Sequence, residues 1–196
     1  MTSRTHDAFA FAALTTIAVY YPPGSLNLAT AIVSLIGCEI GSLLPDVDQA
    51  SNRLWDLLPG GNMIGKMCKG IFIAHRTISH SLIGTFLLYK LLWLVLSVLL
   101  NENSIGIQTV VNSVMIGFLS HLLLDSFTEA GLPLFFPFTF KVGFPPLRSW
   151  RIKTGKGFEK FVVFPSIIVY LVWFASNHQA KIIEILKLVT NKYFGS

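Results

Sequence analysis

Residues 105–127 read IGIQTVVNSVMIGFLSHLLLDSF, an apolar stretch whose single charged residue is Asp125. This length and composition predict a membrane-spanning helix, because about 20 apolar residues cross the hydrocarbon core. His121 and Asp125 are four residues apart, so a helix places both on one face. An anion at the carboxyl end of a helix is disfavoured unless a cation lies close, which points to a metal. The alternative is a capping histidine beside a solvated aspartate.

The composition extends the membrane prediction to the whole chain. Of its 196 residues, 53% are hydrophobic and 13% charged, and the mean hydropathy is +0.62. Soluble domains are less apolar, so we expect an integral membrane protein. Further apolar runs at 7–21, 28–44, 82–100 and 161–176 predict an all-α, polytopic membrane bundle of about five transmembrane helices. No repeat or linker marks a boundary, so residues 1–196 are predicted to form a single domain.

Lysine and arginine are unevenly distributed among the predicted loops. Loop 45–81 carries four and loop 129–160 carries six, whereas loops 22–27 and 101–104 carry none. The positive-inside rule then predicts a cytoplasmic N-terminus and an external C-terminus. These loops also explain the net charge of +5, so no nucleic-acid partner is expected. Residues 178–196 have helical amphipathic spacing and are predicted to lie on the membrane surface.

Histidine and carboxylate side chains occur at the ends of these apolar runs, and the predicted topology places them all on the cytoplasmic side. Such side chains, gathered from several helix ends, can form a divalent metal site. The predicted metal ligands are His6, Asp46, Asp48, His75, His80, His121 and Asp125. We expect Zn²⁺, with Mn²⁺ as the alternative because carboxylates are numerous. For the aspartate pair, a solvated turn is the competing interpretation.

Three further residues are candidates for catalysis. Arg76 follows His75, and its planar guanidinium group can grip a phosphate. Glu39 lies seven residues before Asp46, on nearly the same helix face but deeper in the membrane, where ionisable groups tend to face a functional interior. Glu39 or Glu159 is predicted to act as general base or to support a ligand.

The sequence lacks the motifs of several hydrolase classes. There is no HExxH, GxSxG or Walker glycine loop, which argues against a zincin protease, a serine hydrolase and an ATPase. Metal-assisted hydrolysis remains, and an arginine beside a metal suits a phosphoester. A metal- or proton-coupled transporter is the main alternative, but its polar residues should continue across the membrane. A non-catalytic adaptor with a structural metal is the third.

Four motifs occur in order along the chain: GSLLPDVD at 41–48, HRTISHS at 75–81, HLLLDSFTEAG at 121–131 and TGKGFE at 154–159. Together they resemble the YdjM-type family of bacterial and archaeal inner-membrane proteins. The resemblance covers most of the chain and implies a metal-dependent hydrolase of the inner membrane. Gln49 stands where that family often has a histidine, which puts one ligand in doubt. Ser79 replaces a more usual threonine, a mild change.

A more distant similarity concerns the His-x-x-x-Asp pair with its upstream aspartate and histidine. This combination is similar to zinc-dependent phospholipase C and related single-strand nucleases, which hold several zinc ions. No counterpart of their second histidine-rich set follows Asp125, so fewer metals are expected here. The analogy favours a phosphoester in a lipid or a membrane-proximal molecule as substrate.

The predicted topology can be tested by cysteine accessibility in a chain whose Cys38 and Cys68 are replaced by serine. A cysteine introduced by Asp56→Cys or Lys153→Cys should resist an impermeant thiol reagent in intact cells, because both loops are expected inside. A Ser196→Cys chain should be labelled. Labelling at position 56 from outside would contradict the orientation.

Overall fold

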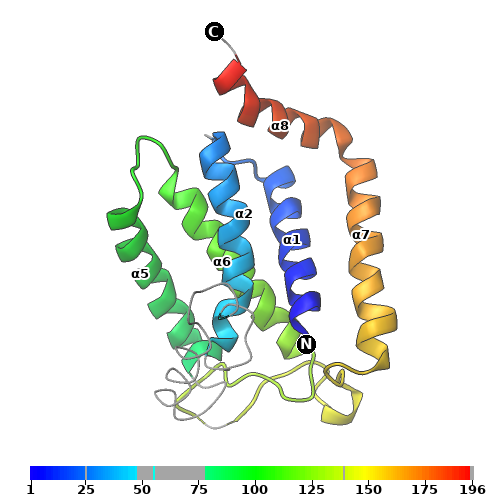
Figure 1. The fold of residues 1–196 in the computed structure, drawn as a ribbon. Helices are drawn as coiled ribbons and strands as arrows, with labels where there is room; N and C mark the ends of the chain where they lie inside the picture. Colours follow the sequence, from blue (N-terminus) through cyan, green and yellow to red (C-terminus); the bar gives the residue numbers. More distant parts are fainter. Residues whose placement is uncertain (25, 48–54, 56–77, 139, 195–196) are drawn as a thin grey trace.

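The computed structural model describes residues 1–24, 26–47, 55, 78–138 and 140–194, with the side chains of 191–194 left out. Its described part is built from helices, which confirms the all-α prediction (Figure 1). The α-helices are α1 (Ser3–Tyr20), α2 (Leu28–Leu43), α5 (Leu82–Leu99), α6 (Ile107–Ser126), α7 (Phe164–Asn177) and α8 (Gln179–Phe194). They begin within a few residues of the predicted apolar runs.

Four helical stretches of the described chain are long and apolar enough to cross a membrane. They are Leu28–Asp46, Leu82–Leu99, Ile107–Ser126 and Glu159–Asn177. Helix α1 lies where the first span was expected but is not among them, because Arg4, His6 and Asp7 lower the apolar content of its first turns. The membrane bundle is therefore confirmed, whereas the predicted count of about five spans is not.

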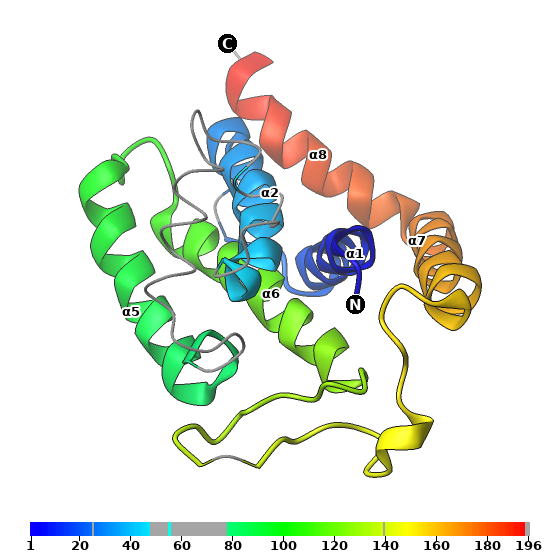
Figure 2. The ribbon, with the colours of Figure 1, turned by 60° about the horizontal axis from the view of Figure 1, so that its bottom comes forward.

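Helices α1, α2 and α6 form the centre of the bundle, with α5 and α7 on opposite sides of them (Figures 1 and 2). Two glycines allow the backbones of α2 and α6 to approach closely. A Cβ atom on Gly41 would lie 2.1 Å from the carbonyl oxygen of Val114, and one on Gly117 would lie 2.0 Å from that of Cys38. Small residues serve this purpose at helix interfaces in membranes. The approach brings the final turns of both helices together.

Two short 3₁₀ turns at the same end of the bundle continue or precede a helix. Helix α2 runs on into Leu44–Asp46, where Pro45 fixes the backbone. The turn Ile78–His80 leads into α5, whose N-cap Ser81 accepts a hydrogen bond from the amide of Gly84. Satisfying that amide sets where α5 begins. These turns carry Asp46 and His80 to the end of the bundle.

The C-terminal part of the chain contains a π-helical turn before α7 and the last helix, α8. A π-helical turn, Glu159–Val163, leads directly into α7. Helix α8 crosses the end of the bundle opposite the N-terminus (Figure 1). Ile182 and Ile185 are half-buried and Val189 is buried on one face of α8, whereas the charged residues between them are exposed. This pattern confirms the predicted amphipathic helix.

The close packing of α2 on α6 can be tested with Gly117→Ala. The added methyl group overlaps the α2 backbone, and overpacking of this kind typically costs about 1–3 kcal/mol. We expect a lower melting temperature of the purified protein in detergent. Gly24→Ala is the control, because a Cβ there meets nothing within 4 Å. Equal melting temperatures for the two variants would contradict this packing.

Candidate metal centre

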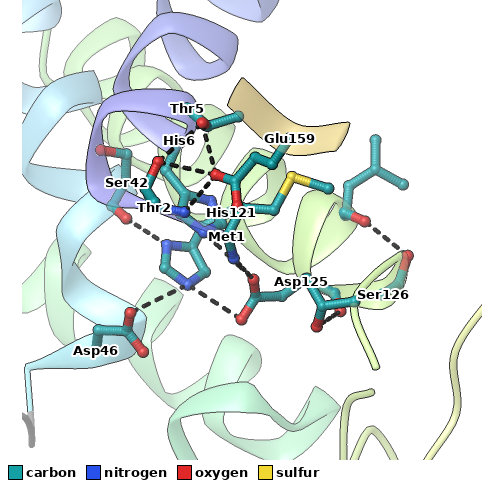
Figure 3. A network of polar contacts seen from close by, with 12 residues as sticks. Met1, Thr2, Thr5, His6, Ser42, Asp46, His121, Asp125, Ser126 and Glu159 are labelled. Atoms are coloured by element: carbon teal, nitrogen blue, oxygen red, sulfur yellow. Dashed lines mark hydrogen bonds and ion pairs between the residues drawn. The ribbon is translucent and has the colours of Figure 1, made fainter. Parts of the chain in front are cut away.

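The polar side chains gather at the end of the bundle that holds the N-terminus (Figures 1 and 3). They come from the first turns of α1, the 3₁₀ turn after α2, the 3₁₀ turn before α5 and the last turns of α6. The predicted ligands that meet here are His6, Asp46, His80, His121 and Asp125. The predicted residues Asp48, His75 and Arg76 lie outside the described residues.

Asp46, His80 and His121 form one group whose ligand atoms lie within 4.8 Å of one another, and Asp125 contacts both of its histidines. His80 Nε2 lies 3.6 Å from Asp46 Oδ1 and 3.9 Å from Asp125 Oδ2. His121 Nε2 lies 3.7 Å from Asp46 Oδ2 and 3.8 Å from the same Asp125 oxygen. Ligands bound to tetrahedral zinc at about 2.0–2.2 Å are roughly 3.4 Å apart. Each of these imidazole-carboxylate separations exceeds that value by about 0.2–0.5 Å, so small movements would bring each pair to the spacing of two ligands on one ion.

A backbone carbonyl fixes the orientation of His121. Its Nδ1 lies 2.6 Å from the carbonyl oxygen of Ser42, which can only accept a hydrogen bond, so Nδ1 carries a proton. In the neutral ring, the lone pair of Nε2 then points toward the carboxylates of Asp46 and Asp125. A proton on Nε2 would not make a hydrogen bond to either carboxylate, because the distances of 3.7 and 3.8 Å exceed hydrogen-bond length.

The same nitrogen is buried and has no hydrogen-bond partner among the described residues. An unsatisfied polar atom at such a place is costly. A cation between the imidazoles and carboxylates would satisfy it, and a histidine that donates its other N–H to a carbonyl is a common arrangement behind a metal. The donor set therefore fits a divalent ion.

Asp125 is fully buried and faces partners through both of its oxygens. Oδ1 lies 3.3 Å from His6 Nε2 and 2.5 Å from the amino group of Met1, while Oδ2 faces His80 and His121. The ring of His6 stacks on that of His121, with centroids 3.7 Å apart and planes 7° from parallel. Asp125 thus contacts His6 through one oxygen and His80 and His121 through the other. Ligand atoms of His6, His121 and Asp125 form a second group within 4.8 Å of one another.

Glu159 is also fully buried, but its carboxylate binds backbone and hydroxyl groups. Oε1 accepts hydrogen bonds from the Thr2 amide at 2.6 Å, the Thr2 hydroxyl at 2.8 Å and the Thr5 hydroxyl at 2.7 Å. Oε2 accepts one from the Gly155 amide at 2.6 Å, and Gly155 has a positive φ of 72°. These bonds tie the start of α1 to the turn before α7. We call this set of contacts the Glu159 clamp.

Neither ligand group formed by the described residues includes Glu159 or Glu39. Glu39 is half-buried one turn before Ser42, whose hydroxyl donates to the Glu39 carbonyl and to Asp7 Oδ1. Sequence reasoning did not find the Ser42 carbonyl, Thr2 or Thr5. A backbone carbonyl has no sequence signature, and the two threonines become recognisable only beside Glu159.

The clamp is testable through Glu159→Gln. The NH₂ group of the new amide would face a backbone N–H group, from which the carboxylate now accepts a hydrogen bond. Two donors that face each other in a buried place cost about 1–3 kcal/mol. We expect a lower melting temperature, with Glu184→Gln on exposed α8 unchanged. A residue needed only for proton transfer would leave stability intact, so an unchanged melting temperature would argue against the clamp.

Comparison with known proteins gives relatives over most of this chain. YvsG of Bacillus subtilis (strain 168), described as an uncharacterized protein, is 29% identical over 163 residues, which are 83% of this chain and 88% of YvsG. Inner membrane protein YdjM of Escherichia coli (strain K12) is 30% identical over 131 residues, 67% of this chain but only 61% of that protein. No solved structure matches. The family model described as YdjM inner membrane protein matches residues 1–183, so the chain belongs to the YdjM family of inner membrane proteins.

Proposed function

We propose that the protein is a metal-dependent hydrolase of the inner membrane, with the ion held by Asp46, His80, His121 and Asp125. The observation that carries the proposal is the buried Nε2 of His121, oriented by Ser42 toward two carboxylates. The amino group of Met1 already faces Oδ1 of Asp125, and a divalent ion would add positive charge on the other side, where Oδ2 and Asp46 face His121. Two nitrogens and two oxygens suit Zn²⁺, and Mn²⁺ is the alternative.

Access to the proposed site is from the side of Asp46. The Asp46 side chain is 22% exposed, whereas those of His80, His121 and Asp125 are 2% exposed or less. A catalytic site must leave a coordination position for water or substrate, unlike a closed structural site. The exposure of Asp46 therefore favours an enzyme over an adaptor with a structural metal.

The chain's own residues then have distinct roles in the proposed reaction. A bound divalent ion supplies Lewis acidity and makes its water a nucleophile near neutral pH. His80 and His121 offer neutral nitrogens, and the Ser42 carbonyl keeps the second ring in place. Asp125 is oriented by the contacts of its Oδ1 with the Met1 amino group and with His6. Asp46 is the ligand that an incoming substrate meets first.

A phosphoester in a lipid or membrane-proximal molecule is the substrate class we propose. The support is chemical: a metal and an arginine together stabilise the charge that develops during phosphoryl transfer. Arg76 would bind the phosphate, and Asp48 and His75 would add to the ligand pool; all three lie outside the described residues. For Glu159 we propose a positioning role through the clamp, since α1 carries His6.

The arrangement of buried ionisable groups argues against transport. Among the described residues, every buried histidine, aspartate and glutamate lies at the end of the bundle that holds the N-terminus. A coupled transporter needs such groups further across the membrane. The buried polar residues toward the other end, such as Thr30 and Ser34, do not titrate in the physiological range. This asymmetry favours chemistry at one surface.

The proposal predicts both metal content and activity. Purified protein should carry about one divalent ion per chain by elemental analysis, and His121→Ala or Asp125→Ala should reduce it to near zero. His178→Ala is the matched control, because His178 contacts Tyr20 and Phe174 far from the site. Metal-replete protein in lipid should hydrolyse a phosphoester from a substrate panel, and chelation should abolish this.

Two results would count against the proposal. Unchanged metal content in both ligand variants would refute the assigned site. If the protein bound one ion per chain but hydrolysed no phosphoester, the ion would be structural and the proposed phosphoesterase activity would be refuted.

A further inference from the structure

An apolar groove with a volume of about 650 Å³ lies between α1 and α7. Helix α7 lies on the side of α1 away from α2 (Figure 2). Helix α6 forms its floor through Leu124, and its walls include Phe9 and Ala13 of α1 and Val163 and Ile167 on the α7 side. Phe158, Val162 and Ile17 at its rim are 58%, 45% and 41% exposed, so the groove opens outward. Its far wall belongs to the membrane-length stretch Glu159–Asn177. The α7 wall of the groove is therefore long and apolar enough to lie within the bilayer.

Polar contacts hold α1 and α7 together on both sides of this groove. At the metal-centre end, the Glu159 clamp joins Thr2 and Thr5 to the turn before α7. Further along, the hydroxyl groups of Thr16 and Tyr170 are 2.7 Å apart. Between these contacts the small side chains of Ala13 and Ser166 leave the space. The groove is thus framed at both ends by hydrogen bonds.

Three exposed cationic side chains lie near the metal-centre end of the groove. Arg4 precedes Thr5 of the clamp, and Lys156 and Lys160 flank Glu159. None of the three forms an ion pair within the described part of the chain. Basic side chains at a membrane surface attract anionic lipid, by about 1 kcal/mol each. The apolar groove therefore ends beside a positively charged surface.

We propose that this groove binds the acyl chain of an anionic phospholipid, whose phosphate lies against Arg4, Lys156 and Lys160. The helical rise from Phe158 to Tyr170 is about 18 Å, comparable to one extended acyl chain. The groove is apolar along this length and ends beside cationic side chains, which is the arrangement that an acyl chain joined to an anionic headgroup requires.

The groove and the metal centre share the last turns of α6, because Leu124 directly precedes Asp125. The proposed lipid would therefore have its phosphate at the same end of the bundle as the metal ligands. The further step, that this lipid is also the substrate, rests on the proposed function. The proposal that the lipid binds in the groove is independent of it.

The test uses full-length protein in nanodiscs that contain phosphatidylglycerol with a photoactivatable group in one acyl chain. After irradiation, peptide mass spectrometry should find the label on segments containing Ala13 and Val163 in preference to lipid-facing α5. Ala13→Trp should fill the groove and reduce labelling there by at least about five-fold. Val98→Trp, on a position of α5 that is 79% exposed, is the control and should not change groove labelling. Ser166→Leu serves as the second variant if Ala13→Trp does not fold.

The headgroup preference is tested in the same experiment. A phosphatidylcholine probe should label the groove less than phosphatidylglycerol, and Lys156→Gln with Lys160→Gln should remove that difference. Equal labelling of α5 and the groove, or full labelling of both groove-filling variants, would overturn the proposal. Labelling is measured on both metal-free and metal-loaded protein, so it tests lipid binding independently of hydrolysis. A failure of the lipid proposal can therefore be told apart from a failure of the proposed function.

Discussion

The hydrogen bond from His121 Nδ1 to the carbonyl oxygen of Ser42 joins the two central helices at the end where the site forms. It exists because Gly41 and Gly117 let the backbones of α2 and α6 approach more closely than any side chain would permit. The bond sets the direction of Nε2, and that direction brings the lone pair toward Asp46 and Asp125. Packing of the bundle and the chemistry of its end thus depend on the same approach of two helices.

The remaining elements support this pair of helices from outside. Helix α1 contributes His6, which stacks on His121 and contacts Asp125, and the Glu159 clamp fixes the start of α1 against the turn before α7. Asp125 therefore faces histidines and the amino group of Met1, whereas Glu159 accepts only hydrogen bonds. Asp125 is therefore suited to bind a cation, and Glu159 is suited to stabilise the fold. The same clamp lies near one end of the apolar groove.

Sequence patterns predicted the helices well, because membrane-length apolar runs leave the backbone few alternatives to a helix. They also predicted His6, Asp46, His80, His121 and Asp125 as neighbours, since all occur at helix ends on one predicted side. The polar first turns of α1 explain why the predicted count of about five spans was not confirmed. The Ser42 carbonyl, the clamp and the groove could not be predicted, because each depends on how distant segments pack rather than on a pattern within one segment.

The most direct test of the central claim is the structure of the protein crystallised with Zn²⁺, with diffraction recorded on both sides of the zinc absorption edge. The account predicts an anomalous peak between the Nε2 atoms of His80 and His121 and the carboxylates of Asp46 and Asp125, at about 2.0–2.2 Å from each ligand. It also predicts that Nδ1 of His121 remains bonded to Ser42. A zinc ion bound elsewhere, or a protein that binds none while these four side chains keep their present places, would contradict the account.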